Sequence, residues 1–174
     1  SANVINEAFG KLWLETIDKL EKEKAEIAGV ILTSAKSTFF AGADIDNLYK
    51  QTDAKLIFEM CEGLKAQLRR LETLGKPVVA ALNDTALGGG LEIALACHYR
   101  IALNNPKAQF GLPEVGLGLL PGGGGIVRLT RMIGLQPALP LLTEGKRLKV
   151  KEALSNGIIN EIAETSEEMM AKAK

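Results

Sequence analysis

Two glutamates of this sequence, Glu92 and Glu114, have neighbours suited to proton chemistry. Glu92 follows three consecutive glycines, Gly88 to Gly90, at the predicted start of a helix, where backbone N–H groups lack partners. Glu114 lies in the segment GLPEVGL, whose apolar residues disfavour a charged carboxyl group and so favour a raised pKa. A carboxyl group with a raised pKa can donate a proton near neutral pH. We hypothesise that the two glutamates form a pair with separate proton duties.

Each glutamate also has a simpler interpretation. Glu92 alone could do no more than stabilise a helix dipole, and Glu114 alone could be a solvated loop residue. The glycine run before Glu92 also fits a phosphate cradle, but the nucleotide signatures fail. From Gly88 the sequence reads GGGLEI, without the third glycine of G-x-G-x-x-G, and no G-x-x-x-x-G-K-[ST] occurs. Nucleotide binding is therefore the weakest functional hypothesis.

Composition favours small-molecule chemistry. With 174 residues, 47% of them hydrophobic, the chain suits one domain over residues 1–174 with a sizeable core. Lysine plus arginine equals aspartate plus glutamate at 21 each, so we expect neither nucleic acid nor an anionic membrane as a partner. No apolar run predicts a membrane span. One histidine and two cysteines make a histidine or thiolate metal site unexpected, so we predict no metal.

Hydrophobic periodicity predicts alternating helices and strands. Helical spacing predicts helices at 4–24, 53–74, 88–97, 126–133, 150–156 and, in a polar run, 167–174. Apolar, β-branched runs predict strands at 27–33, 78–83, 99–103 and 158–162, with a short one at 108–111. Pro137 and Pro140 are expected to interrupt the segment after residue 133. This alternation predicts the α/β class with parallel strands.

Three glycine-containing motifs follow one another along the chain: FFAGAD at Phe39–Asp44, NDTALGGGLE at Asn83–Glu92, and FGLPEVGLGLLPGGGG at Phe110–Gly125. They resemble, in order, the signatures F-x-A-G-A-D, N-x-x-A-x-G-G-G-x-E and F-G-x-P-E-x-x-x-G-x-x-P-G-x-G-G of the enoyl-CoA hydratase/isomerase (crotonase) superfamily. The resemblance covers nearly all of the chain. The segments ALACHYR, NNPK and RMIG look most like the hydratase part of multifunctional fatty-acid oxidation enzymes.

The resemblance implies a crotonase-like spiral of ββα units. Relatives usually begin with a strand hairpin ahead of the region that residues 1–6 resemble, and continue beyond residue 174 into further helices. We therefore expect a fragment that lacks the N-terminal hairpin and the C-terminal helices, and that could be folded yet inactive by itself. In the multifunctional enzymes a 3-hydroxyacyl-CoA dehydrogenase follows the hydratase, so NAD is expected only if such a domain lies downstream.

The resemblance also implies a role for each motif residue. The backbone N–H groups of Ala43 and Gly89 would form an oxyanion hole for a thioester carbonyl, and Gly122 would help hold a water molecule. Glu92 would deprotonate that water, and Glu114 would supply a proton to the α-carbon. Residues expected to line the substrate and its CoA moiety are Ala41, Gly42, Asp44, Ile45, Gly88 and Pro113.

The function implied is hydration of a trans-2-enoyl-CoA to a 3-hydroxyacyl-CoA in fatty-acid β-oxidation, with no cofactor besides the CoA of the substrate. Two alternatives stay open: Δ3-Δ2-enoyl-CoA isomerisation, which needs the oxyanion hole and one base, and an acyl-CoA-binding module without catalysis. The expected partners are an acyl-CoA thioester and either further copies of the chain, as a homo-oligomer, or a β-oxidation complex with a thiolase. A bacterial cytoplasmic location is expected.

Overall fold

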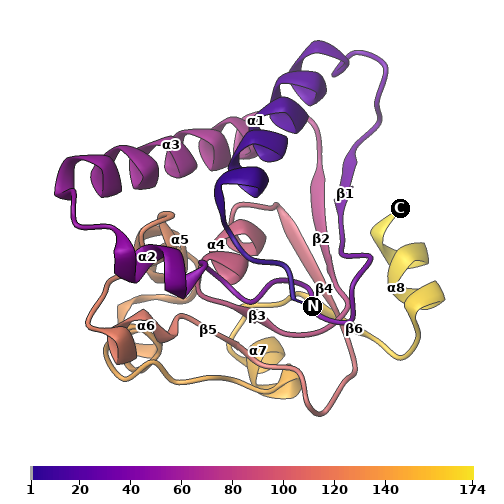
Figure 1. Ribbon diagram of the computed structural model, residues 1–174. Coiled ribbons are helices and arrows are strands. Elements are labelled where there is room, and N and C mark those ends of the chain that lie inside the picture. Colours follow the sequence, from indigo (N-terminus) through magenta and orange to yellow (C-terminus); the bar gives the residue numbers. More distant parts are fainter. Residues whose placement is uncertain (1) are drawn as a thin grey trace.

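The computed structural model describes residues 2–174 and has a parallel β-sheet at its centre. Four strands lie in the order β1-β2-β4-β6, and every neighbouring pair is parallel (Figure 1). Their bounds are Val30–Leu32, Val78–Leu82, Tyr99–Leu103 and Glu161–Ala163. The predicted α/β class with parallel strands is confirmed.

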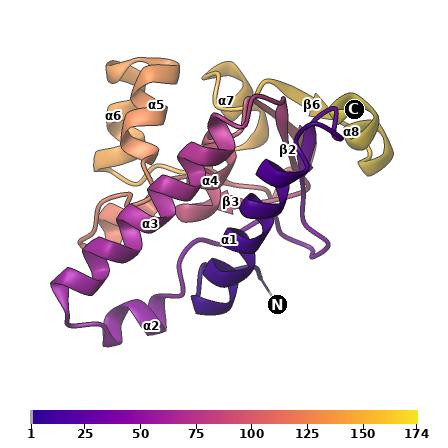
Figure 2. The ribbon, with the colours of Figure 1, turned by 90° about the horizontal axis from the view of Figure 1, so that it is seen from above.

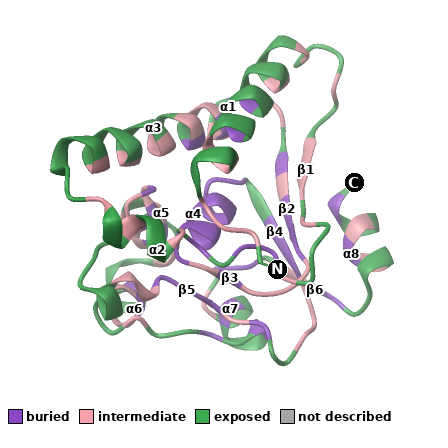
Figure 3. Cartoon of the chain, viewed as in Figure 1, coloured by how far each residue is buried: buried purple, intermediate pink, exposed green. Residues whose placement is uncertain are grey.

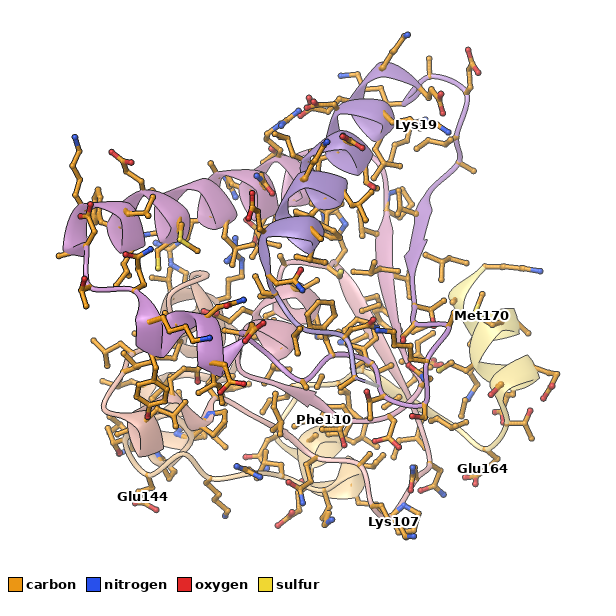
Figure 4. The ribbon with its side chains drawn as sticks, viewed as in Figure 1. Lys19, Lys107, Phe110, Glu144, Glu164 and Met170 are labelled. Atoms are coloured by element: carbon orange, nitrogen blue, oxygen red, sulfur yellow. The ribbon has the colours of Figure 1, made fainter. Side chains whose placement is uncertain are left out.

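A second, two-stranded parallel sheet pairs β3 (Ala86–Leu87) with β5 (Phe110–Gly111). An isolated parallel bridge from Phe40 to Ala86 extends this second sheet. Successive segments of the chain therefore each contribute to both sheets. Phe110, labelled in Figure 4, is fully buried where β5 joins this layer. The chain thus winds as the predicted spiral, and each turn brings a glycine motif to the edge of the second sheet.

The helices cover both faces of the large sheet. α1 (Glu7–Lys22) and α3 (Ala54–Glu72) lie side by side, whereas α8 (Ser166–Ala173) lies on the opposite face (Figures 1 and 2). α4 (Gly89–Leu95) is buried throughout, while the first turns of α3 are exposed (Figure 3). The remaining helices are α2 (Ile45–Lys50), the 3-10 helix η1 (Pro113–Leu117), α5 (Gly125–Ile133), α6 (Leu135–Thr143) and α7 (Val150–Ser155). Within residues 2–174, no helix is both long and apolar enough to cross a bilayer.

The alternation of side chains along β2 divides the core into two layers. Val78, Ala80 and Leu82 pack into the larger core under α1, α3 and α4. Ala81 packs into a smaller core under α8 with Ile101 and Met169. Because successive strand residues point to opposite faces, a strand buried on both faces must be apolar at every position, as VVAAL is.

Local capping explains where the long helices begin. The Asn6 side chain accepts the Phe9 N–H at the start of α1, and Asp53 accepts two N–H groups at the start of α3. Behind these caps the apolar residues recur at helical spacing, and Trp13 and Leu68 enter the core. Both helices therefore lie within the predicted ranges.

The structure corrects three local predictions. Pro137 and Pro140 do not interrupt a helix, because both lie inside α6. Pro137 is in the first turn, where N–H groups have no intrahelical partner, and Pro140 removes only the N–H that would bond to the carbonyl of Gln136, an exposed residue. The last strand is β6, displaced from the predicted 158–162, because residues 158 and 159 fill the core in the turn after α7. The short elements α2, β3 and η1 were not predicted.

Candidate active site

Glu92 is a buried carboxyl group held by a glycine loop. It lies in the first turn of α4 with 3% of its surface exposed. Its Oε1 accepts two backbone hydrogen bonds, from the N–H groups of Gly123 and Gly125, each 2.8 Å long. Its Oε2 lies toward Gly89 at the start of the same helix. One oxygen of Glu92 is therefore fixed by two donors, while the other lies 4.0 Å from where a Cβ at Gly89 would be.

The glycines of the loop 121–125 permit this close approach. A Cβ atom at Gly123 would lie 2.8 Å from Glu92 Oε2, and one at Gly125 would lie 2.9 Å from Oε1. Carbon and oxygen do not pack so closely, so a side chain at either position would displace the carboxyl group. The sequence PGGGG thus supplies backbone donors at a distance that other residues would prevent.

The two hydrogen bonds limit the effect of burial on Glu92. Burial raises the pKa of Glu92, while the N–H groups of Gly125 and Gly123 and the positive charges of Arg128 and Lys65 lower it. The net pKa lies above the ordinary value for glutamate. A carboxylate with this pKa is a stronger base than an exposed one.

Glu114 has a different environment, in the first turn of η1. Its Oε2 is buried and has no hydrogen-bond partner among residues 2–174, and its Oε1 lies 3.1 Å from where a Cβ at Gly88 would be. Burial raises the pKa of Glu114 to about 7; its own backbone N–H opposes this rise, and the charge of Glu92 adds to it. The two glutamates are therefore near enough to influence each other, and Glu114 carries a proton more readily.

Two backbone segments meet beside the glutamates. The loop at Gly42 approaches the start of α4 so closely that a Cβ at Gly42 would lie 3.7 Å from the Gly89 nitrogen. Ile5 and Ala43 form an isolated parallel bridge, in which the Ile5 N–H donates to the Gly42 carbonyl and the Asp44 N–H donates to the Ile5 carbonyl. The N–H of Ala43, which lies between these two bonds, therefore points away from Ile5. The Gly89 N–H opens α4, and the preceding Gly88, at φ +53°, has no side chain to cap it. Two N–H groups from separate motifs are thereby available next to the carboxyl groups.

The other predicted contact residues lie around this point. Ala41 is exposed and donates its N–H to the carbonyl of Asn3 (2.9 Å). The Asp44 side chain caps α2 by accepting the Asn47 backbone N–H (3.2 Å) and side-chain N–H (2.8 Å). Ile45 is 44% exposed at the first position of α2. Pro113 begins η1 and is half-buried. The substrate contacts predicted for these residues remain predictions.

Sequence reasoning missed several neighbours of Glu92. It did not single out Gly123 and Gly125, whose N–H groups hold the carboxylate. The role predicted for Gly122, holding a water molecule, remains a prediction. Cys61 is half-buried on α3 and touches the loop, since a Cβ at Gly122 would lie 2.9 Å from its Sγ. Burial and then the charge of Glu92 raise the pKa of this thiol. The repeated glycines were the available signal for the loop, and nothing in the sequence pointed to Cys61.

A parallel α/β spiral thus brings two buried or half-buried carboxyl groups to one glycine turn, and carboxyl groups of this kind are suited to acid–base chemistry. Comparison with known proteins gives the family. Residues 1–174 match the family described as Enoyl-CoA hydratase/isomerase, and the chain belongs to that family of lyases and isomerases.

Among curated proteins, the chain is similar to two named fatty acid oxidation complex subunit alpha. It is 41% identical over 159 residues to the protein of Aliivibrio fischeri and 45% identical over 165 residues to that of Shewanella halifaxensis. Each match covers 91% of this chain but only 23% and 22% of the respective relative. The chain therefore spans less than a quarter of the length of these relatives.

Solved structures show the same fold. The enoyl-CoA hydratase of Bacillus anthracis superposes with a TM-score of 0.89 at 33% identity, covering 99% of this chain and 65% of that one. The enoyl-CoA hydratase of Thermoplasma volcanium also gives a TM-score of 0.89, at 30% identity, covering 97% and 66%. The predicted crotonase-like fold is confirmed.

Proposed function

We propose that this chain carries the site for hydrating a trans-2-enoyl-CoA to a 3-hydroxyacyl-CoA. The observation that carries the proposal is that the carboxyl groups of Glu92 and Glu114 both lie close to the glycine turn that starts α4. Glu92 takes a proton from water as the water oxygen bonds to C3 of the enoyl group. The C2=C3 electron pair shifts toward the thioester oxygen, and Glu114 then delivers its proton to C2. The product thus gains OH from water and H from Glu114. The proton that Glu92 took must then pass to Glu114, directly or through solvent, to restore both groups. The net change is the addition of one water molecule, and dehydration is the same sequence reversed.

The N–H groups of Ala43 and Gly89 are proposed to bind the thioester oxygen as negative charge develops on it. Both are backbone donors, one pointing away from its bridge partner and the other uncapped at the start of α4. A well-aimed donor of this kind contributes roughly 3 kcal/mol to a transition state, or about 100- to 1000-fold in rate. Gly122 is proposed to help hold the attacking water, and Ala41, Gly42, Asp44, Ile45, Gly88 and Pro113 to line the substrate.

The protonation states support this division of work. The pKa of Glu114, about 7, leaves its acid form populated near neutral pH. The two N–H groups at Glu92 stabilise its ionised form, which is the form that accepts a proton from water. These opposite effects support the proposal that Glu92 acts as the base and Glu114 as the acid in the first step of hydration.

The names of the relatives support a place in fatty-acid β-oxidation. Hydration is proposed to need no cofactor beyond the CoA of the substrate, with NAD serving only a dehydrogenase domain elsewhere in a longer polypeptide. The proposed partners are further copies of the chain or a β-oxidation complex with a thiolase. A bacterial cytoplasmic location is proposed, supported by the bacterial relatives and by two unpaired thiols, Cys61 and Cys97.

Δ3-Δ2-enoyl-CoA isomerisation is the second candidate. It is favoured by Glu114 itself, whose buried Oε2 has no partner and can move a proton between carbons beside the oxyanion site. This reaction needs the two N–H groups and one carboxyl group, so it can share the site with hydration. Non-catalytic acyl-CoA binding is the third outcome.

The test compares Glu92→Gln and Glu114→Gln with wild type in the full-length protein, using 2-enoyl-CoA and 3-enoyl-CoA in separate assays. Each variant should lower kcat for hydration about 100- to 10,000-fold, because each removes one acid–base group. Binding of a saturated acyl-CoA, followed by calorimetry, should change less than about threefold, since glutamine keeps the shape.

Glu15→Gln is the matched control, because Glu15 is exposed on α1, and it should keep wild-type turnover. Near-normal hydration by either site variant would exclude the two-carboxylate mechanism. Turnover of 3-enoyl-CoA alone would identify an isomerase, and binding without turnover of either substrate would identify a binding module.

A further inference from the structure

A half-buried arginine touches the loop that holds Glu92. Arg128, in the first turn of α5, donates from Nη1 to the carbonyl of Gly123 (2.8 Å) and from Nε to Oε1 of Glu72 (2.5 Å). The side chains of Arg128 and Glu72 are 14% and 21% exposed, so the pair is largely shielded from solvent. Such a pair keeps more of its strength than an ion pair on the surface.

The loop needs a brace because it contains four consecutive glycines. Glycine loses more conformational freedom on ordering than any other residue, so Gly122 to Gly125 would sample many arrangements if nothing fixed them. Gly123 is held at both of its polar groups: its N–H bonds to Glu92 and its C=O accepts from Arg128. Arg128 therefore fixes Gly123, whose N–H group holds the Glu92 carboxylate.

Glu72 links this brace to the central sheet. It is the last residue of α3, and its carbonyl bonds to Nε2 of His98 (3.0 Å). Since Nδ1 of His98 accepts the Val78 N–H (2.9 Å), the proton of a neutral imidazole lies on Nε2, which donates to Glu72. The carboxylate of Glu72 also meets Arg69, at 3.3 Å on the surface. The brace is thus anchored at the start of β2 and just after the helix that carries Glu92.

We infer that Arg128 and Glu72 are positioning residues that hold the Gly123 peptide, and through it the Glu92 carboxylate, in the geometry used to activate water. The inference rests on the proposed hydration for its kinetic consequence. The structural part, that the pair orders the 121–125 loop, stands independently of which reaction occurs.

The charged groups around Glu92 define the expected pH effect. Lys65 and Cys61 face it from α3, Arg128 from α5 and Glu114 from η1. Removing Arg128 takes away a positive charge and loosens the N–H donors, and both changes raise the pKa of Glu92. The acidic limb of kcat/KM should therefore move to higher pH. Lys65→Gln removes a charge without touching the loop carbonyl, so it separates the charge effect from the brace.

The experiment uses the full-length protein with two readouts. Hydrogen–deuterium exchange followed by mass spectrometry measures the amides of the 121–128 segment, and steady-state kinetics measures kcat and KM for 2-enoyl-CoA between pH 5 and 9. In Arg128→Gln, exchange of the segment should accelerate at least about tenfold and kcat should fall at least about tenfold, while KM changes less than about twofold. Arg128→Lys should recover part of kcat, and Glu72→Gln should change exchange and kcat in the same direction as Arg128→Gln.

Two controls accompany these variants. Arg131→Gln, exposed on the same helix, should match wild type in exchange and kinetics, and Lys65→Gln should shift the acidic limb with wild-type exchange. Wild-type exchange in both Arg128→Gln and Glu72→Gln would overturn the inference, as would faster exchange spread over the whole protein. If wild type does not hydrate 2-enoyl-CoA, the proposed function fails, while the exchange data still decide whether the pair orders the loop.

Discussion

Glu92 and Glu114 are the same residue type beside the same glycine turn, but their carboxyl oxygens have different hydrogen-bond partners. Glu92 has one oxygen fixed by two backbone N–H groups and is 3% exposed. Glu114 is less buried, yet its Oε2 has no partner, and the nearby negative charge is that of Glu92. The more buried group thus has the better-stabilised charge, because hydrogen bonds to the ionised form oppose the effect of burial.

This contrast shows how one residue type can serve two duties. Donated N–H groups favour a carboxylate, as at Glu92, while a buried oxygen without a donor favours the protonated acid, as at Glu114. A base and an acid can then coexist near neutral pH within one site. The difference between the two carboxyl groups depends on backbone donors. Substituting the glycines that supply these donors should therefore affect it as strongly as substituting the glutamates.

Among the changes that leave both glutamates in place, the largest effect is expected from disturbing the donors of Glu92. In Gly125→Ala, the new Cβ would lie 2.9 Å from both Cγ and Oε1 of Glu92 and must displace that side chain. We expect kcat for hydration to fall about 100-fold, as a displaced catalytic group typically causes. Stopped-flow or steady-state hydration assays of the full-length protein measure this.

Gly116→Ala is the matched control for Gly125→Ala. Gly116 lies in η1, two residues from Glu114, and a Cβ there would meet nothing within 4 Å. Its kcat should stay within about twofold of wild type. Equal losses in the two alanine variants would show that the loops are generally intolerant and that the donors of Glu92 have no special role.

A smaller effect, about tenfold per pH unit, should appear on the alkaline side of the rate profile. Hydration needs Glu114 protonated, and the pKa of this group is about 7 in the free protein. A plot of kcat/KM against pH should therefore fall above pH 7, and the residual activity of Glu114→Gln should lack this limb. A flat wild-type profile from pH 6 to 9 would remove Glu114 from the role of acid.

The smallest expected effect is on stability. The pKa of Glu114 in the folded state, about 7, is above its ordinary value of 4.5, so the neutral form is favoured by folding. This contribution is fully present below pH 4.5 and is lost as the pH rises through 7. Glu114→Gln cannot ionise, so its free energy of unfolding should exceed that of wild type by about 1–2 kcal/mol at pH 8, after allowance for partial exposure.

Urea unfolding at pH 4.5 and pH 8 measures this difference, with Glu15→Gln as the exposed control. The gain from Glu114→Gln should be seen at pH 8 and not at pH 4.5, and the control should show no such dependence. A gain that is equal at both values would mean that the charge of Glu114 has no cost in the folded protein.

The sequence was informative where the cause is local. Periodic apolar residues behind Asn6 and Asp53 predicted α1 and α3, because a capped amphipathic segment needs little beyond its own residues. The prediction from the prolines of α6 was wrong. The free-energy cost of a proline in a helix depends on whether the backbone groups that lose a hydrogen bond are buried or exposed, and the local sequence does not determine this. The two-residue strand β3 was not predictable, since it is defined by its partners at Phe40 and Phe110.

The sequence by itself determined the kinds of group present in the site: two carboxyl groups, glycine backbones able to approach them, and the order of the three motifs. Only the tertiary structure decided what each group does. The donors of Glu92 lie 31 and 33 residues away along the chain, and the partner of Arg128 lies 56 residues away. The physical reason is that burial and hydrogen-bond distance set the proton affinity of a carboxyl group, and both are properties of segments brought together by folding.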